Sequence, residues 1–273
     1  MKNRILFSIL LMPIIFSCKN KQENKPLDHG VNIENHTLVH QKEKKHWTYE
    51  GETGPEHWIE IEKESECDGK RQSPINIIDI DVQDDNLLKP LDTHYSRNVK
   101  IHEVTNNGHT IQYNFEKGDF ILLNNEKYEL RQIHFHEASE HTINGIRYPL
   151  EMHLVHINKD NKIAVLAVLA KEGVSSEPFT FLEKYLPVKN GETKLINSKF
   201  DLNLSLPKSK DYYTYSGSLT TPPCTQNVAW FIYKTPITIS VGQVKELQKL
   251  LPINNYRNEQ SINGRIVKQY SSS

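Results

Sequence analysis

Three histidines with strand-like spacing are the residues of this sequence most able to do chemistry. His134 and His136 flank Phe135, and His153 follows further along the chain. Successive side chains of a strand point to opposite faces, so His134 and His136 would share a face that Phe135 does not. If a neighbouring antiparallel strand carries His153 on that face, the three imidazoles meet. Three neutral imidazoles leave one tetrahedral position open, which is the ligand set of a catalytic zinc site.

The neighbours of these histidines could orient them, because a metal-binding histidine donates its other ring N–H to an acceptor. Gln132 and Glu151 lie on the correct faces for this role. Two alternatives stay open at this point. A bare His-x-His pair also fits two surface histidines on a strand. His134, His136 and Glu140 match the first half of a cupin motif, which would bind iron or manganese, although the second cupin motif does not follow.

Apolar and β-branched runs, separated by turn residues, predict that strands position these side chains. The expected strands cover 98–104, 109–115, 120–123, 128–136, 150–157, 163–169 and 228–233. The segment 163–169 is apolar on both faces, which predicts a central strand. Helical patterns occur at 176–186 and 241–250. We therefore predict one sheet-dominated α+β domain, with a large, twisted, mostly antiparallel sheet and short peripheral helices.

The composition is that of a soluble globular protein. The 273 residues include 33 basic and 34 acidic ones, which gives a net charge of −1. This balance argues against disorder, collagen-like repeats and a polytopic membrane protein, and it gives no overall electrostatic reason to bind nucleic acid.

The first residues have the pattern of an export signal. A basic start precedes the apolar run 5–16, which is shorter than the roughly 20 residues that span a bilayer. The run ends at Cys18 in a sequence that resembles a bacterial lipobox. We expect a lipoprotein-type signal peptide over 1–17, lipidation of Cys18, a polar flexible tether over 18–45 and a folded domain over 46–273. An ordinary secretory signal is the alternative.

The predicted destination is the periplasm or the cell surface, with the chain anchored to a bacterial membrane through Cys18. Apart from that residue, only Cys67 and Cys224 remain as cysteines. Exported proteins fold where disulfides form, so we expect one bridge between them. Two free thiols are the alternative.

Six ordered blocks of the sequence resemble the α-type carbonic anhydrase family. The blocks are Gly54-Pro-Glu-His-Trp58, Gln72-Ser-Pro-Ile-Asn76, Asn106-Asn-Gly-His109, Ser139-Glu-His-Thr142, Glu151-x-His-Leu-Val-His156 and Ser218-Leu-Thr-Thr-Pro-Pro223. The resemblance implies a zinc-dependent enzyme that converts CO₂ and water reversibly to bicarbonate and a proton, as a monomer or a homodimer. A catalytically silent binding module on the same fold is the alternative.

The resemblance also implies roles for individual residues. His134, His136 and His153 would hold Zn²⁺, which lowers the pKa of a bound water to about 7, a general value for carbonic anhydrases. Thr220 would accept a hydrogen bond from the resulting hydroxide and donate one to Glu140. This chain of hydrogen bonds would aim the hydroxide at the carbon of CO₂.

Further positions match the family around this centre. His109 would be the proton shuttle, since an imidazole with a pKa near 6.5 accepts a proton from such a water at little cost. Residues that hold the ligands or order active-site water would be Gln132, Glu151, Asn255, Tyr49 and Asn107. The CO₂ pocket would be lined by Thr221, Val155, Val165, Leu219, Val228 and Trp230. Cys67 and Cys224 match positions that are bridged in exported members.

Two other histidines receive plainer interpretations. His156 lies on the opposite strand face from His153 and is expected to be a hydrogen-bonded structural residue. His46 stands at the end of the tether and is expected to be solvated.

Overall fold

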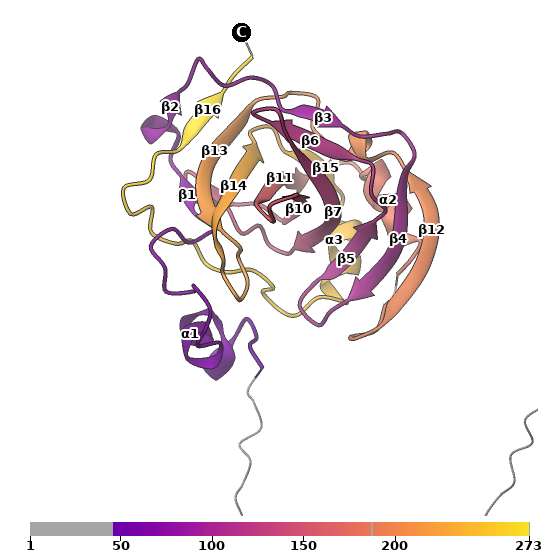
Figure 1. Ribbon diagram of the computed structural model, residues 1–273. Coiled ribbons are helices and arrows are strands. Elements are labelled where there is room, and N and C mark those ends of the chain that lie inside the picture. Colours follow the sequence, from indigo (N-terminus) through magenta and orange to yellow (C-terminus); the bar gives the residue numbers. More distant parts are fainter. Residues whose placement is uncertain (1–45, 187, 273) are drawn as a thin grey trace, which may run out of the picture. The chain divides into compact units, whose positions relative to one another are not determined.

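A 13-stranded sheet dominates the structure, a computed structural model that describes residues 46–186 and 188–272 (Figure 1). The predicted signal peptide, the tether and Cys18 lie outside the described residues. The strands of this sheet are β2 (Gln83–Asp84), β3 (Asp92–His94), β4 (Val99–Asn106), β5 (Ile111–Phe115), β6 (Phe120–Leu123), β7 (Glu126–His136), β10 (Leu150–Asn158), β11 (Ile163–Glu172), β12 (Thr193–Phe200), β13 (Tyr212–Ser218), β14 (Gln226–Tyr233), β15 (Ile237–Ile239) and β16 (Lys268–Tyr270).

The strand order is β12-β4-β5-β7-β10-β11-β14-β13-β16-β2, with β3 beside β6, β6 beside β7 and β15 beside β11. The pairs β11–β14, β11–β15 and β16–β2 are parallel, and the other described pairs of this sheet are antiparallel. The predicted sheet-dominated, mostly antiparallel fold is therefore confirmed. A second, small sheet contains β1 (Asn76–Ile77), β8 (Thr142–Ile143) and β9 (Ile146–Arg147).

Each predicted strand corresponds to one of the observed ones, namely β4, β5, β6, β7, β10, β11 and β14. The residues from Ala164 to Ala170 in β11 are all buried, which confirms that this strand is central. The helices are α1 (Trp58–Ile61), α2 (Glu177–Glu183) and α3 (Val241–Gln248), and short 3₁₀ turns cover Gly51–Thr53, Pro55–His57, Asp79–Asp81 and Leu202–Ser205. The described helices contain none long and apolar enough to cross a membrane.

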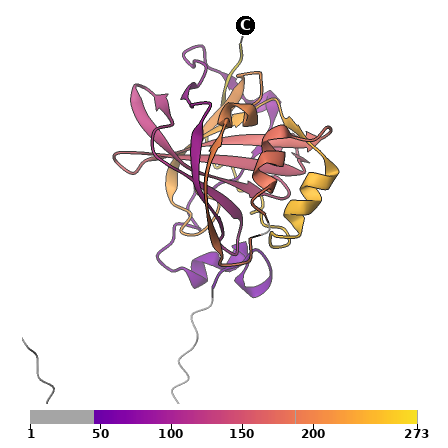
Figure 2. The ribbon, with the colours of Figure 1, turned by 90° about the vertical axis from the view of Figure 1, so that its right-hand side faces the viewer.

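Alternating side chains give the sheet two different faces. Helices α2 and α3 cover one face, where Phe179 and Leu247 join a core with Phe135 and Leu154 (Figure 2). Serine side chains cap the first turns of both helices. The opposite face carries a second apolar cluster that includes Trp230. The odd and even positions of β7 and β10 therefore face different environments, which leaves one face for polar chemistry.

The predicted disulfide is present in the structure. Cys67 and Cys224 are bonded across a sequence separation of 157 residues. They pack in a third apolar cluster with Trp47, Tyr49 and Trp58, so the bridge ties the first described segment to the loop after β13.

Candidate metal centre and active site

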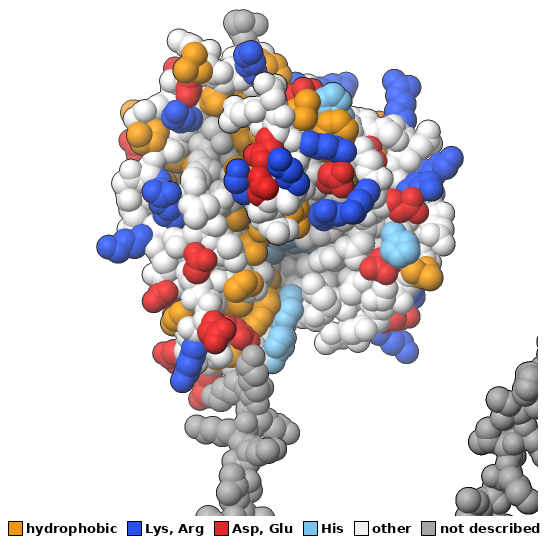
Figure 3. All heavy atoms as spheres, in the orientation of Figure 1, with side chains coloured by type: hydrophobic (Ala, Val, Ile, Leu, Met, Phe, Trp, Pro, Cys, Tyr) orange, Lys and Arg blue, Asp and Glu red, His pale blue; other side chains and the backbone are white. Residues whose placement is uncertain are grey.

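Strands β7 and β10 bring the three predicted metal ligands together. In their antiparallel pairing, His153 lies opposite His134, and Glu151 lies opposite His136. The three histidine rings lie 4.7–5.0 Å apart between centroids, and one ring nitrogen of each lies within 4.8 Å of the others. Figure 3 shows a hollow in one face of the molecule with histidine side chains beside it. The predicted convergence of the rings is thus present.

In each of the three rings, one nitrogen donates a hydrogen bond to an oxygen that has no proton to give. We call this nitrogen the outer nitrogen and the other one the inner nitrogen. This arrangement assigns each tautomer and leaves the inner nitrogen with a free lone pair. The three pairs are His134 Nδ1 with Gln132 Oε1 at 2.8 Å, His136 Nδ1 with the main-chain oxygen of Asn255 at 2.7 Å, and His153 Nε2 with Glu151 Oε1 at 2.8 Å. Gln132, Glu151 and Asn255 therefore all contact the predicted ligands.

The inner nitrogens fit a metal ion better than they fit one another. Nε2 of His134 lies 3.2 Å from Nδ1 of His153, yet neither nitrogen carries a proton to share. Nε2 of His136 is buried and has no hydrogen-bond partner among the described residues. Two nitrogens bound to one tetrahedral zinc ion at about 2.0–2.1 Å lie roughly 3.3 Å apart. The donor set and its spacing therefore suit Zn²⁺.

Burial also favours the neutral form of His134 and His136. Desolvation, reinforced by the neighbouring rings, lowers the pKa of His134 well below its usual 6.5. Desolvation likewise lowers the pKa of His136. Because a metal binds the neutral imidazole, these two ligands meet this requirement without competition from protons near neutral pH.

Glu151 is fully buried and accepts four hydrogen bonds. Its donors are His153 Nε2 at 2.8 Å, His141 Nδ1 at 2.7 Å, and the main-chain N–H groups of Glu140 and His141 at 2.8 Å each. Burial alone would raise the pKa of Glu151, but His141 and His153 outweigh it, so the pKa lies well below 4.5. The side chain is therefore an ionised acceptor that holds His153 in one orientation.

A buried polar network, absent from the sequence analysis, extends from Glu151. His141 Nε2 lies 2.7 Å from the hydroxyl of Tyr215, which lies 2.7 Å from Ser73 Oγ. Ser73 and Ser218 exchange two hydrogen bonds between their main-chain N–H groups and hydroxyls. Ser218 begins the segment that carries Thr220, so one network connects a predicted ligand with the predicted orienting residue. The sequence signals of this network were that His141, Ser73 and Ser218 stand in three of the six blocks.

Glu140 is fully buried behind the three histidines. Its Oε1 accepts the main-chain N–H of Arg257 at 2.9 Å. Its Oε2 has no hydrogen-bond partner among the described residues and lies 3.5 Å from His136 Nε2. Thr220 is also buried. The hydrogen bond from Thr220 to Glu140 stays a prediction.

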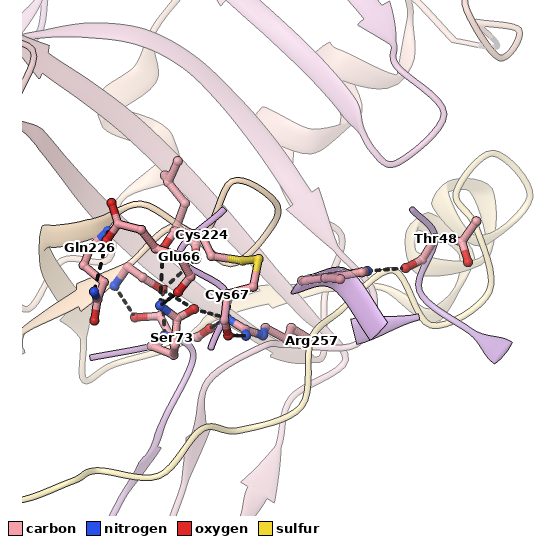
Figure 4. The surroundings of a disulfide bond; sticks show 11 residues. Thr48, Glu66, Cys67, Ser73, Cys224, Gln226 and Arg257 are labelled. Atoms are coloured by element: carbon pink, nitrogen blue, oxygen red, sulfur yellow. Dashed lines mark hydrogen bonds between the residues drawn. A yellow bond between two sulfur atoms is a disulfide. The ribbon is translucent and has the colours of Figure 1, made fainter. Parts of the chain in front are cut away.

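The disulfide region supports Glu140 through Arg257, which sequence reasoning also missed (Figure 4). The buried guanidinium of Arg257 donates to the main-chain oxygens of Cys67 and Ser73, at 3.0 and 3.1 Å. Burial lowers the pKa of Arg257 to about 10, so it stays a cation at neutral pH. The main-chain N–H that donates to Glu140 thus belongs to a residue whose side chain is held by the main-chain oxygens of Cys67 and Ser73.

An apolar wall stands beside the histidines. The predicted wall residues belong to the second apolar cluster, namely Val155, Val165, Val228 and Trp230, with Leu219 partly buried against it. The ring of Trp230 lies 4.9 Å from that of His153. Thr221 is half-buried, and its main-chain oxygen accepts the N–H of Cys224 at 2.8 Å.

The loop before β5 holds His109 against the first described segment. His109 stacks on Trp47 with ring centroids 3.6 Å apart, and its Nε2 lies 2.9 Å from Nε2 of His46. His46 is exposed as predicted, but it is not merely solvated, because it contacts His109. Burial and His46 lower the pKa of His109 to about 4. This value is below the one expected for a free shuttle histidine.

Tyr49 and Asn107 occupy different places around His109. Asn107 is exposed, and its Oδ1 accepts the main-chain N–H groups of His109 and Thr110 at 2.9 Å each. It therefore shapes the loop, and its role in ordering active-site water stays a prediction. Tyr49 is buried, with its ring 6.1 Å from that of His109. Burial, together with Glu140, raises the pKa of Tyr49 well above 10.

Comparison with known proteins agrees with this architecture. A family model described as eukaryotic-type carbonic anhydrase matches residues 53–271. A carbonic anhydrase of Klebsiella pneumoniae is 40% identical over 81% of this chain and 90% of its own length. The solved α-carbonic anhydrase of Thermovibrio ammonificans, in complex with sulfanilamide, is 38% identical over 82% of this chain and 98% of its own, with a TM-score of 0.78. Dioscorin complexed with ascorbate is 32% identical over 84% of this chain and 99% of its own, also with a TM-score of 0.78.

The chain therefore belongs to the eukaryotic-type carbonic anhydrase family. It is an enzyme, and its reaction is the reversible hydration of CO₂ to bicarbonate, EC 4.2.1.1. The cupin alternative is wrong, because the family match and the solved neighbours agree on another fold. The relatives named carbonic anhydrase also decide against a silent binding module.

Proposed function

We propose that His134, His136 and His153 hold the zinc ion on which CO₂ hydration depends. The observation that carries this proposal is the orientation of the rings: every outer nitrogen donates to an acceptor, so every inner nitrogen offers a lone pair. When bound, zinc acidifies water and so supplies a nucleophile at neutral pH. The fourth tetrahedral position has no protein ligand among the described residues and is left for solvent.

Thr220 and Glu140 orient the attacking oxygen in this proposal. The N–H of Arg257 occupies Oε1 of Glu140, so Oε2 is free to accept the hydroxyl proton of Thr220. With that proton committed, Oγ1 of Thr220 can only accept a hydrogen bond from the attacking O–H group. The oxygen then presents a lone pair to CO₂ rather than a proton.

The apolar wall binds CO₂ and keeps bulk water from its carbon. Val165, Val228 and Trp230 are almost fully buried in one apolar cluster, and the ring of Trp230 lies 4.9 Å from that of His153. A non-polar substrate loses little by leaving water for such a surface. Thr221, on the loop that also carries Thr220, completes the pocket beside the wall.

His109 removes the proton that hydration releases. Asn255 supports this role, because its side chain donates to the main-chain oxygen of His109 and its own main-chain oxygen accepts from the predicted ligand His136, while the ring of His109 contacts the exposed His46. Because burial lowers its pKa to about 4 in the stacked position, His109 must either leave Trp47 or pass the proton on immediately.

Replacement of one ligand tests the function directly. In His134→Ala, both bound zinc and CO₂ hydration should be lost, because the two imidazoles that remain bind zinc too weakly. The matched control is His102→Ala, which removes an exposed histidine of β4. Retained CO₂ hydration in His134→Ala, with the control at wild-type activity, would contradict the assignment of the ligands.

The proposal extends to the location of the enzyme. The signal pattern over 1–17 and the lipobox-like Cys18 support export and a lipid anchor at a bacterial membrane, with the domain in the periplasm or on the surface. The Cys67–Cys224 bridge is consistent with an oxidising compartment. Cys18→Ser should move activity from the membrane fraction to the soluble exported fraction. If activity stayed with the membranes, the anchor would not be Cys18.

A further inference from the structure

His46 and His109 form a hydrogen-bonded pair of imidazoles next to the active-site face. Their Nε2 atoms lie 2.9 Å apart, and their ring centroids lie 5.0 Å apart. At this distance the two nitrogens share one proton, carried by one ring and accepted by the other. Nδ1 of His109 has no hydrogen-bond partner in the described part of the chain, so it is free to take up a proton.

The chain holds both rings of this pair in place. Asn107 caps the His109 loop, and the side chain of Asn255 donates to the main-chain oxygen of His109 at 3.1 Å. On the other side, Trp47 stacks on His109 with the rings 10° from parallel.

The segment that carries His46 is itself anchored. Trp58 Nε1 donates to the main-chain oxygen of Thr48 at 2.8 Å (Figure 4), and the N–H of Thr48 donates to Thr53 at 2.8 Å. Trp47 and Tyr49 pack with the disulfide in one cluster. His46 therefore directly precedes an anchored segment and stands beside His109.

The environment of His109 disfavours its protonated form, so the ring can pass a proton on but does not keep it. Burial, and to a smaller extent the neighbouring ring of His46, lower its pKa to about 4. An acid with a pKa near 7 would charge this ring only with a penalty of about a thousandfold in equilibrium. His46, a base in contact with His109, removes that penalty, because one proton leaves Nε2 of His109 as another proton arrives at Nδ1.

We propose that His46 is the exit residue of a two-histidine proton relay, a proposal that rests on the shuttle role of His109. His109 takes up a proton at Nδ1 while its Nε2 proton passes to Nε2 of His46. His46 then releases one proton to buffer. Only N–H bonds form and break, one proton enters and one leaves, and solvent water then takes the proton from Nδ1 of His109 and gives one to its Nε2, which restores the starting tautomer. The exposed position of His46 suits it for contact with buffer, whereas His109 is half-buried.

The test compares His46→Gln with His102→Gln in the zinc-loaded full chain. Gln keeps a polar side chain at position 46 but does not accept a proton at neutral pH. We expect His46→Gln to lower kcat about tenfold in dilute buffer, with kcat/KM unchanged, because proton removal follows the release of bicarbonate. Added imidazole should restore kcat. His102→Gln, which replaces an exposed histidine of β4 beside Glu103, should keep the wild-type kcat.

A second readout does not depend on activity. Ring-nitrogen NMR should show the pKa of His109 rising in His46→Gln, because the neighbouring imidazole no longer opposes its charge. An unchanged titration of His109 would overturn the contact on which the relay depends.

The variant His109→Gln distinguishes a failure of the two-histidine relay from a failure of the shuttle role of His109. If His109→Gln lowers kcat in dilute buffer and His46→Gln does not, the relay is wrong and the shuttle stands. If His109→Gln has no effect, the shuttle itself fails and the relay fails with it. The double variant should be no slower than His109→Gln alone, since the two residues act in series. Multiplied losses would indicate separate exits and overturn the proposal.

Discussion

His134 and His153 face each other across two antiparallel strands, with Nε2 of one 3.2 Å from Nδ1 of the other and no proton available between them. Buried acceptors left without a partner cost about 1–3 kcal/mol each. The strands nevertheless hold the lone pairs together, because Gln132 and Glu151 take the outer N–H groups. A cation is the partner that satisfies both nitrogens at once, so the fold is arranged for an ion.

Zinc affinity should depend on the charge of Glu151. In Glu151→Gln the neutral amide replaces a carboxylate that accepts four hydrogen bonds, and its NH₂ group opposes donors. We expect the zinc affinity to fall about 10- to 100-fold, the usual effect of changing a group that orients a ligand. Competition with a chelator measures it. Glu116→Gln, at an exposed ion pair with Lys100, is the control and should keep wild-type affinity. Equal affinities of both variants would exclude this role of Glu151.

The disulfide should contribute a large share of the stability. Cross-linking a loop of 157 residues is worth roughly 5 kcal/mol in the chain-entropy model. The double variant Cys67→Ala/Cys224→Ala should therefore lose free energy of unfolding on this scale in guanidinium titrations. Wild-type protein under a reductant provides the matched control and should unfold at the same midpoint as the variant. A midpoint equal to that of the oxidised wild type would contradict the expectation.

The buried His156 should make the fold sensitive to acid. Its Nε2 bonds the hydroxyl of Tyr95 at 2.7 Å, as expected for a structural histidine, and burial lowers its pKa to about 3. An unfolded histidine titrates near 6.5, so its contribution is complete above that pH and declines as the pH falls towards 3. Between pH 6 and pH 4 the loss is about 2–3 kcal/mol.

The comparison of His156→Gln with Tyr95→Phe isolates this effect. Both variants change the same hydrogen bond, but only His156→Gln removes the titrating ring. The free energy of unfolding should therefore fall less steeply with acid in His156→Gln, while Tyr95→Phe should keep the wild-type slope. Parallel curves for all three proteins would assign the acid sensitivity to other groups.

The sequence predicted best where one residue pattern controls both local structure and chemistry. Alternation in β7 and β10 places His134, His136 and His153 on one face and Phe135 on the other, and the structure follows it. The doubly apolar β11 was equally predictable, since few alternatives bury such a segment.

Other elements lacked such a pattern. Strand β12 is an edge strand that alternates between exposed and half-buried residues, and it holds few apolar side chains. Strand β13 was also not predicted, although Tyr213 and Tyr215 alternate with smaller residues. Edge strands depend on pairing with a distant segment, which a local pattern does not reveal.

The parts of the site that depend on long-range contacts also escaped prediction. His141, Tyr215 and Ser73 join only because three separate segments meet behind Glu151. His46 was expected to be solvated because polar residues precede it, and only the packing of Trp47 on His109 brings it to the site. Polar networks of this kind carry no periodicity in the sequence.

Anomalous diffraction at the zinc edge, from crystals of the purified chain, tests the central claim most directly. The account predicts one peak within about 2.0–2.1 Å of Nε2 of His134, Nε2 of His136 and Nδ1 of His153. A peak elsewhere, or a peak coordinated by Nε2 of His153 instead of Nδ1, would contradict it.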